Sequence, residues 1–184
     1  AGNSSLGVNS LCANTTGTSN TGIGCGALKA NTTAADNTAV GAESLLSNTT
    51  GANNVAVGKN SMQQNTTGGS NTALGMQSLQ CNTTASNNTA VGRCSLRNNT
   101  TGFNNNAFGC GALRDTTTGA RNVAVGKAAM ALTTTGNCNV AIGDAALVNN
   151  TSGENNVAIG RQALNSAQTA SNNTAVGFCS LYTN

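Results

Sequence analysis

The segments NTTGANNVAVGKNSMQQ (48–64), NTTGGSNTALGMQSLQC (65–81) and NTTASNNTAVGRCSLRN (82–98) follow one another without a gap. With position 1 set at Asn14, repeats of seventeen residues begin at 14, 31, 48, 65, 82, 99, 116, 133, 150 and 167. A partial repeat occupies 1–13, and the register never slips. Such periodicity is typical of a solenoid, in which each repeat stacks on the next.

The composition differs from that of an ordinary enzyme. The 184 residues include no His, Trp or Pro, 7% are charged, and the net charge is +3 with the basic residues spread along the chain. No apolar run approaches eighteen residues, so we expect no membrane insertion in this segment. Aromatic and basic residues do not interleave, so we expect no nucleic-acid partner. We take 1–184 as a single repeat array, with full repeats from 14 to 183, and expect it to be part of a longer chain.

Two uniform columns bound a three-residue segment such as Val-Ala-Val (55–57). Position 11 is always Gly, which indicates positive φ or close backbone approach, and position 7 is always Asn, which favours turns and stacked amide ladders. A short strand between turn formers is therefore predicted. The glycines are Gly24, Gly41, Gly58, Gly75, Gly92, Gly109, Gly126, Gly143, Gly160 and Gly177. The ladder residues are Asn20, Asn37, Asn54, Asn71, Asn88, Asn105, Asn122, Asn139, Asn156 and Asn173.

These features predict an all-β fold, a parallel β-solenoid or β-roll with one coil per seventeen-residue repeat and about eleven coils. A helical array would use longer repeats with few Gly and Asn. Position 10 is always apolar and position 15 is always Leu or Met, so we predict that both are buried. All thirteen charged residues fall on positions 5, 6, 12, 13, 16 and 17. We therefore expect positions 12, 13 and 16 to be exposed.

Position 9 holds Ala in nine repeats and Gly22 in the other. Neighbouring residues in a strand point to opposite faces, so an inward position 10 turns position 9 outward. A uniformly small outward column, on a coil with a thin core, predicts a homotrimer or another side-by-side oligomer. The alternative is that both strand faces are buried within one narrow coil. The predicted contacts are Ala39, Ala56, Ala73, Ala90, Ala107, Ala124, Ala141, Ala158 and Ala175.

Three stretches, NNVAVGKNSM (53–62), NTAVGRCSL (88–96) and NNVAIGRQAL (155–164), resemble the head repeats of trimeric autotransporter adhesins and of phage and viral tail-fibre-like proteins. The resemblance recurs in every repeat. It implies a left-handed parallel β-roll, three rolls packed side by side, and a surface that binds host matrix or other cells. It also implies an extracellular location, on a virion or a cell. The repeat is longer than is common in that family, and the Asn-Thr-Thr-Gly segment is the expected insertion.

Seven cysteines, an odd number, lie on variable columns with no regular spacing. Cys12 with Cys25, and Cys81 with Cys94, are each thirteen residues apart, so a disulfide between neighbouring coils is one interpretation. Free thiols on a protein assembled in a reducing compartment, such as a virion fibre, are the other. The remaining cysteines are Cys110, Cys138 and Cys179.

Catalytic and metal-binding patterns are missing from the sequence. Without His, no Ser–His or Cys–His pair can form, and no metal-type cysteine spacing occurs. The five carboxylates are scattered, and the glycines follow the coil period rather than a phosphate-binding loop. We expect no enzyme activity and no cofactor.

Positions 1–3 form glycosylation sequons in seven repeats. The alternative, which we favour, is that these residues are turn and ladder formers, since Thr116 and Thr133 replace the Asn without disturbing the pattern. The sequon residues are Asn14, Asn31, Asn48, Asn65, Asn82, Asn99 and Asn150.

The expected function is a structural or adhesive fibre segment that acts through many weak contacts with an unidentified host surface or matrix ligand. Ice binding through a stacked Thr column is the alternative, since positions 2 and 3 are each Thr in nine repeats. Adjacent residues point to opposite faces, so we expect only one of these columns to face outward.

Overall fold

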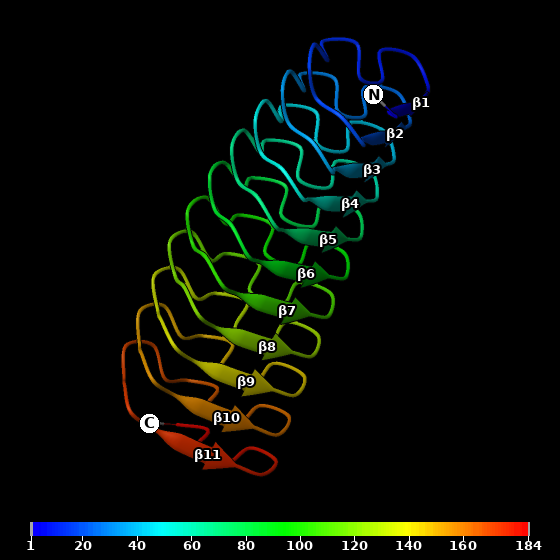
Figure 1. Cartoon of the computed structure of the whole chain (residues 1–184). Coiled ribbons are helices and arrows are strands. Elements are labelled where there is room, and N and C mark those ends of the chain that lie inside the picture. The colour runs from blue at the N-terminus through cyan, green and yellow to red at the C-terminus, as the bar shows by residue number, and fades with distance from the viewer. Residues whose placement is uncertain (1, 184) are drawn as a thin grey trace.

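The computed structural model describes residues 2–183, which form a rod of stacked coils with the termini at opposite ends (Figure 1). The described chain contains eleven strands of three residues each, and no helix. The strands are β1 (Ser4–Leu6), β2 (Thr21–Ile23), β3 (Thr38–Val40), β4 (Val55–Val57), β5 (Thr72–Leu74), β6 (Thr89–Val91), β7 (Asn106–Phe108), β8 (Val123–Val125), β9 (Val140–Ile142), β10 (Val157–Ile159) and β11 (Thr174–Val176). The predicted parallel β-solenoid is confirmed.

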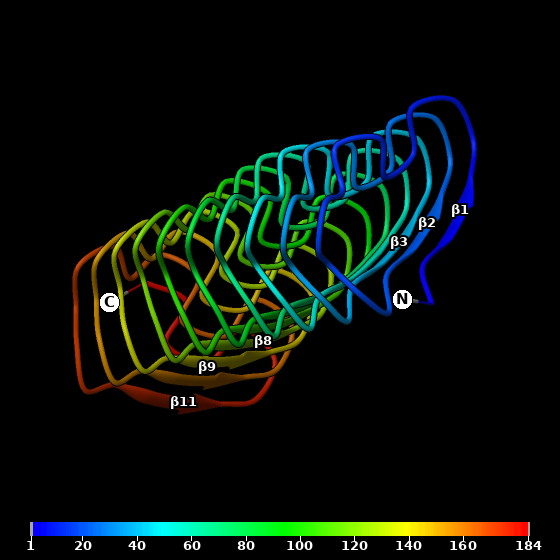
Figure 2. The ribbon, with the colours of Figure 1, turned by 45° about the horizontal axis from the view of Figure 1, so that its top comes forward.

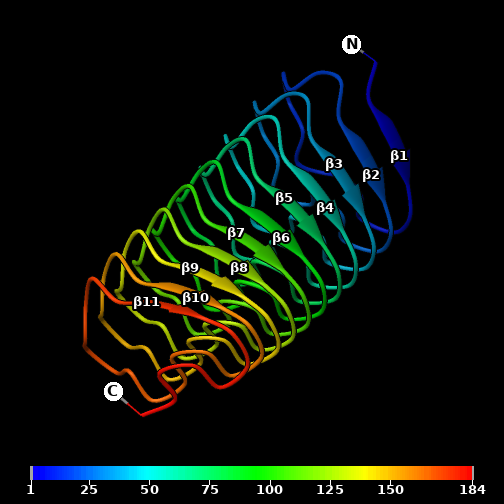
Figure 3. The same ribbon diagram turned by 90° about the horizontal axis from the view of Figure 1, so that it is seen from below.

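All strands belong to one parallel sheet in the order β1 to β11, and each residue pairs with the residue seventeen positions away. The sheet runs along one side of the rod, while the remaining residues of each coil loop away and return (Figures 2 and 3). At about 4.8 Å per strand, eleven coils span roughly 50 Å. The repeat period is thus the length of one turn of the solenoid.

Each coil closes within seventeen residues because several residues adopt left-handed backbone conformations. Positions 6, 13 and 15 have positive φ in almost every coil, as in Asn53 (60°), Asn60 (59°) and Met62 (50°). This conformation costs an ordinary side chain about 1–2 kcal/mol. Backbone hydrogen bonds between coils offset that cost, for example Met62 N–H to the carbonyl of Ser78 at 3.0 Å. The corners are therefore held by the stack as a whole.

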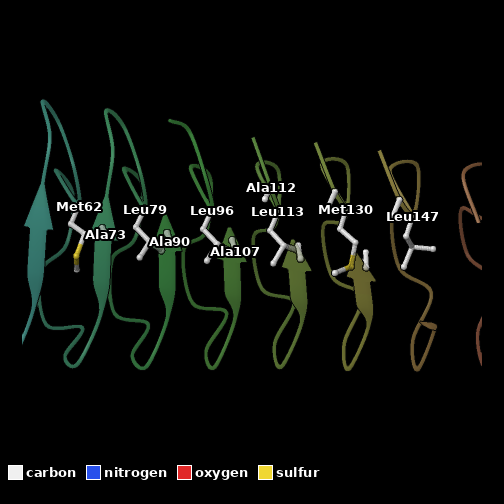
Figure 4. Close-up of a cluster of buried hydrophobic side chains, with 14 of the residues drawn as sticks. Met62, Ala73, Leu79, Ala90, Leu96, Ala107, Ala112, Leu113, Met130 and Leu147 are labelled. Atoms are coloured by element: carbon white, nitrogen blue, oxygen red, sulfur yellow. The ribbon is translucent and has the colours of Figure 1, made fainter. Parts of the chain in front are cut away.

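The core is a narrow column of small and large side chains in line along the rod (Figure 4). Leu or Met at position 15 is fully buried from Leu28 to Leu164, as expected. Ala at position 9 and Ala or Ser at position 14 are buried beside it, for example Ala56 and Ser44. The Ser44 hydroxyl donates to the carbonyl of Ala56 at 2.9 Å, so this buried polar group is paired. Apart from buried Asn side chains, the interior of one coil thus holds one large and two small side chains.

The prediction that position 10 is buried is wrong. Its side chains lie on the outer face of the sheet, and seven of them, from Ile23 to Ile159, are 37–40% exposed. Position 9 occupies the interior instead, because only a small residue fits between the strand and the Leu or Met at position 15. Positions 13 and 16 are mostly half-buried rather than exposed, whereas position 12 is exposed in nine of ten repeats.

Candidate functional surfaces

The Ala column of position 9 faces the interior of its own chain. Eight of its members have no exposed surface, and Ala175 is 3% exposed. These side chains cannot touch a second chain, so their assignment as oligomer contacts is corrected. The corrected residues are Ala39, Ala56, Ala73, Ala90, Ala107, Ala124, Ala141, Ala158 and Ala175.

The outer face of the sheet is formed by positions 8 and 10, which point away from the Ala column. Position 8 is Thr, Val or a single Asn, and position 10 is always bulky and apolar. Val55, Val57, Leu74 and Phe108 are 37–40% exposed even in the middle of the rod. The face therefore presents an apolar row at position 10 beside a mixed row of Thr and Val at position 8, along the length of the sheet. The sequence did contain a signal for it: the uniform columns 7 and 9 are two residues apart, so in an extended segment their side chains share a face.

The Asn ladder at position 7 lies on the inward side of the strand and is buried from Asn20 to Asn156. In one rung, the Asn54 amide Nδ2 donates to Asn37 Oδ1 at 3.1 Å and to the carbonyl of Gly68 at 2.9 Å. The Asn54 backbone N–H also donates to Asn37 Oδ1, at 3.0 Å. Each rung thus ties together three neighbouring coils.

A second buried ladder runs through position 1. Asn65 Nδ2 donates to Asn48 Oδ1 at 2.8 Å and to the carbonyl of Gly68 at 2.9 Å. The ladder stops where Thr116 and Thr133 replace Asn, and both hydroxyls are buried without a hydrogen-bond partner, as is Asn99 Oδ1. This location argues against the sequon interpretation, since a glycan cannot be attached to an amide with no exposed surface. The fully buried sequon residues are Asn31, Asn48, Asn65, Asn82, Asn99 and Asn150, while Asn14, in the first full repeat, is half-buried.

The Gly column of position 11 lies at the end of each strand. Gly58 has a φ of 131°, and a Cβ there would lie 2.6 Å from the carbonyl carbon and oxygen of Gly75 in the next coil. Both the backbone conformation and the close approach of neighbouring coils therefore exclude a side chain. The same geometry recurs from Gly24 to Gly160, so this column allows the coils to stack at the spacing of a sheet.

The two Thr columns face different ways. Position 2 is mostly half-buried, and its hydroxyl donates to the carbonyl of the next coil, as from Thr49 to Thr66 at 3.1 Å. Position 3 is exposed in every repeat, for example at Thr50 and Thr84. One row of Thr therefore faces solvent.

Four of the eight basic side chains, which are dispersed in the sequence, lie together in space. Arg93, Arg97, Arg114 and Lys127 line a depression of about 300 Å³ over the turns that follow β6, β7 and β8. Arg114 forms a two-point contact with Asp115, with nitrogen–oxygen distances of 3.1 and 2.8 Å. That hydrogen-bonded pair lowers the pKa of the Asp115 carboxyl and raises that of Arg114. Sequence reasoning missed this cluster because its members are up to 34 residues apart in the chain, from Arg93 to Lys127, but lie on neighbouring coils.

All seven cysteines are free thiols, so neither Cys12–Cys25 nor Cys81–Cys94 is a disulfide in the structure. Cys94 is buried although its column was expected to be solvated, and its Sγ lies 3.5 Å from Gln77 Oε1. Cys12 and Lys29 line a second, shallow depression of about 460 Å³ over the first coils. Its walls are mainly apolar and carry one charge, that of Lys29.

Within residues 2–183, no three His, Cys, Asp or Glu side chains gather as a metal-binding group would require. The same part of the chain contains no helix with the length and hydropathy needed to cross a membrane. No protein-family model, curated protein or solved structure matches the chain. What the geometry offers is three extended surfaces: the outer sheet face, the exposed Thr row and the basic depression.

Proposed function

We propose that this chain is a structural or adhesive segment of a fibre on a virion or cell surface, in which three copies associate side by side through the outer sheet face. The observation that carries the proposal is the exposed apolar row at position 10, which lies beside a row of Thr and Val at position 8. Monomeric soluble proteins seldom expose contiguous apolar patches beyond a few hundred Å², and larger ones mark interaction sites.

The size of this face supports a protein partner. Two rows of eleven side chains with about 50 Å² exposed on each provide on the order of 1,000 Å², against the ~800 Å² that each partner gives to a standard interface. The face repeats at the strand spacing along the whole rod. A second copy of this chain has the same length and the same repeat, so it matches the face from end to end.

Three copies suit a face that is two rows wide. Around a three-fold axis parallel to the rod, each chain meets two neighbours, and each row of side chains packs against one of them. Closed rotational symmetry of this kind leaves no apolar row exposed and stops growth at a defined number of chains. The resemblance of the repeats to the heads of trimeric autotransporter adhesins supports the same arrangement and an extracellular role. We propose no catalytic role.

The test compares two triple variants by light scattering after size exclusion. Val57→Lys/Val91→Lys/Val125→Lys places charges on the outer sheet face of alternate coils. Thr50→Lys/Thr84→Lys/Thr118→Lys places the same charges in the same coils on the exposed Thr row. The unsubstituted chain and the Thr-row variant should have three times the 18.1 kDa mass of one chain, and the sheet-face variant should be monomeric. An unsubstituted chain that is monomeric at micromolar concentration would refute side-by-side association.

Ice binding is the second candidate, and the exposed Thr row of position 3 is the observation that favours it. The position 2 hydroxyls are engaged in hydrogen bonds between coils, which leaves a single row where ice-binding faces usually present two. Thermal hysteresis of the purified protein distinguishes the two functions. We expect none, and a measurable value that is lost in the Thr-row variant would establish ice binding instead.

A further inference from the structure

The depression over the turns after β6, β7 and β8 concentrates positive charge. Its four cations, Arg93, Arg97, Arg114 and Lys127, face one carboxylate, that of Asp115, which leaves a local charge of +3. The whole chain also carries +3, so the other four cations and four carboxylates cancel. The net charge of the molecule therefore resides at this site.

One carboxylate, that of Asp115, compensates only part of the positive charge of the cluster. Arg97 and Arg114 occupy position 16, a turn position, of adjacent coils, and like charges at equivalent positions of neighbouring coils repel each other. The Arg114–Asp115 contact is the sole ion pair in residues 2–183, and Arg97 Nε donates to a neutral acceptor, Gln80 Oε1, at 3.2 Å. An anion seated in the depression would relieve this repulsion. Guanidinium groups pair best with planar or tetrahedral oxyanions such as carboxylate, sulfate and phosphate.

Cations also continue along the rod beyond the depression. Position 12 carries Lys59, Arg93, Lys127 and Arg161, one on every second coil, and all four side chains are exposed. Two strand spacings put successive cations about 9.5 Å apart. The position 12 residues of the coils in between are neutral except for Asp144, which lies between Lys127 and Arg161. A linear polymer lying parallel to the rod would therefore meet a cation at regular intervals on both sides of the depression.

We propose that this row and depression bind a linear acidic polysaccharide, with Arg93, Arg97, Arg114 and Lys127 as the central subsite. The proposal rests on the proposed adhesive function and names the class of its ligand. A cavity of about 300 Å³ is at the small end of the range for ligand pockets, which suits one or two sugar units of a longer chain. Single-stranded nucleic acid fits less well, because its binding sites pair cations with aromatic stacking platforms and none of the three Phe or the one Tyr lines this depression.

The experiment measures binding of heparin, alginate and neutral dextran to the immobilised protein at low and moderate salt. Heparin reports on sulfate groups and alginate on carboxylate groups, and the tighter of the two identifies the preferred anion. We expect binding of at least one acidic polymer, none of dextran, and weakening with salt as counterions are displaced. Affinity should also rise with the length of the fragments up to the span from Lys59 to Arg161.

The variant Arg93→Gln/Arg97→Gln should lower the affinity at least tenfold. The matched control Lys29→Gln/Arg121→Gln removes two exposed cations from outside the row and the depression, and should change it less than threefold. Both variants alter solvent-accessible side chains outside the core, and a melting curve verifies that each remains folded.

Several outcomes would overturn the proposal. These are no binding of either acidic polymer at low salt, equal losses in the two variants, equal binding of dextran, or equally tight binding of single-stranded DNA with the same variant dependence. If short fragments or inorganic sulfate bind as tightly as long chains, the site is a single anion pocket, and the proposal of a polymer ligand is wrong. Light scattering on the same samples separates the two proposals: a trimer that binds no polymer rejects the ligand alone, and a monomer that binds it rejects the assembly alone.

Discussion

The two faces of each strand in this rod differ in their surroundings. The inward positions 7 and 9 contact the same residue types in every coil of the same chain, and they are almost invariant, with Asn at one and Ala at the other. The outward positions 8 and 10 are only partly covered, and they range over Thr, Val, Asn, Ile, Leu and Phe. Uniformity in this molecule therefore accompanies packing within the chain, while apolar variety accompanies the exposed face on which the proposed association rests.

The largest effect should come from breaking the inward face. Ala141 is fully buried and its neighbour Ile142 is 40% exposed. Ala141→Gln overpacks the coil and buries an amide, which should cost about 4 kcal/mol of unfolding free energy. Ile142→Gln should cost less than about 0.5 kcal/mol, as for other surface changes. Chemical denaturation in the Val57→Lys/Val91→Lys/Val125→Lys background measures both without the contribution of assembly.

If the two substitutions were equally costly in that background, the assignment of Ala to the interior would be wrong.

A second pair of neighbours tests the ladder. Asn105 Nδ2 donates to the carbonyl of Gly119 at 2.8 Å, and its Oδ1 accepts from the backbone N–H of Asn122 at 3.0 Å. Asn105→Ala leaves the Gly119 carbonyl and the Asn122 N–H buried without these partners, which should lower the unfolding free energy by about 2–3 kcal/mol. Asn106 lies on the outward side of β7, so Asn106→Ala should cost less than about 0.5 kcal/mol in the same background. Comparable losses from the two variants would mean that the amide ladder contributes little.

The smallest effect should come from repairing the interrupted ladder. Thr116 and Thr133 leave their own hydroxyls and Asn99 Oδ1 buried without partners. Thr116→Asn/Thr133→Asn supplies amides that can join Asn99 to Asn150, which should raise the unfolding free energy by about 1–2 kcal/mol. The control Thr118→Asn, at an exposed position, should leave it unchanged. A destabilised double variant would show that local packing has adapted to the two threonines.

The fold could be read from the sequence because one period accounts for every residue. An unbroken seventeen-residue register, with Gly and Asn at fixed offsets, is compatible with a short strand and closed turns and excludes a helix. The burial of Leu79 and its equivalents at position 15 followed from the same reasoning.

Which strand side chains point inward could not be predicted by taking the more apolar column as the core. Charge is absent from position 10 as it is from position 9, although position 10 lies on the exposed face, so the absence of charge does not distinguish the two columns. The width of the coil decides which column points inward, because a Leu such as Leu79 leaves room for only Ala at position 9. The basic depression was missed for a different reason: Arg97 and Lys127 are 30 residues apart and meet only once the coils are stacked.

The central claim, that Ala points inward and the apolar rows point outward under a second chain, is tested most directly by methyl NMR with a soluble nitroxide. The methyl groups of Ala141 and Ala158 should be protected from relaxation in both the assembled protein and the monomeric Val57→Lys/Val91→Lys/Val125→Lys variant. Those of Ile142 and Ile159 should be protected in the assembled protein and strongly relaxed in the monomeric variant. Strong relaxation of the Ile methyls in the unsubstituted protein, or of the Ala methyls in either, would contradict the account.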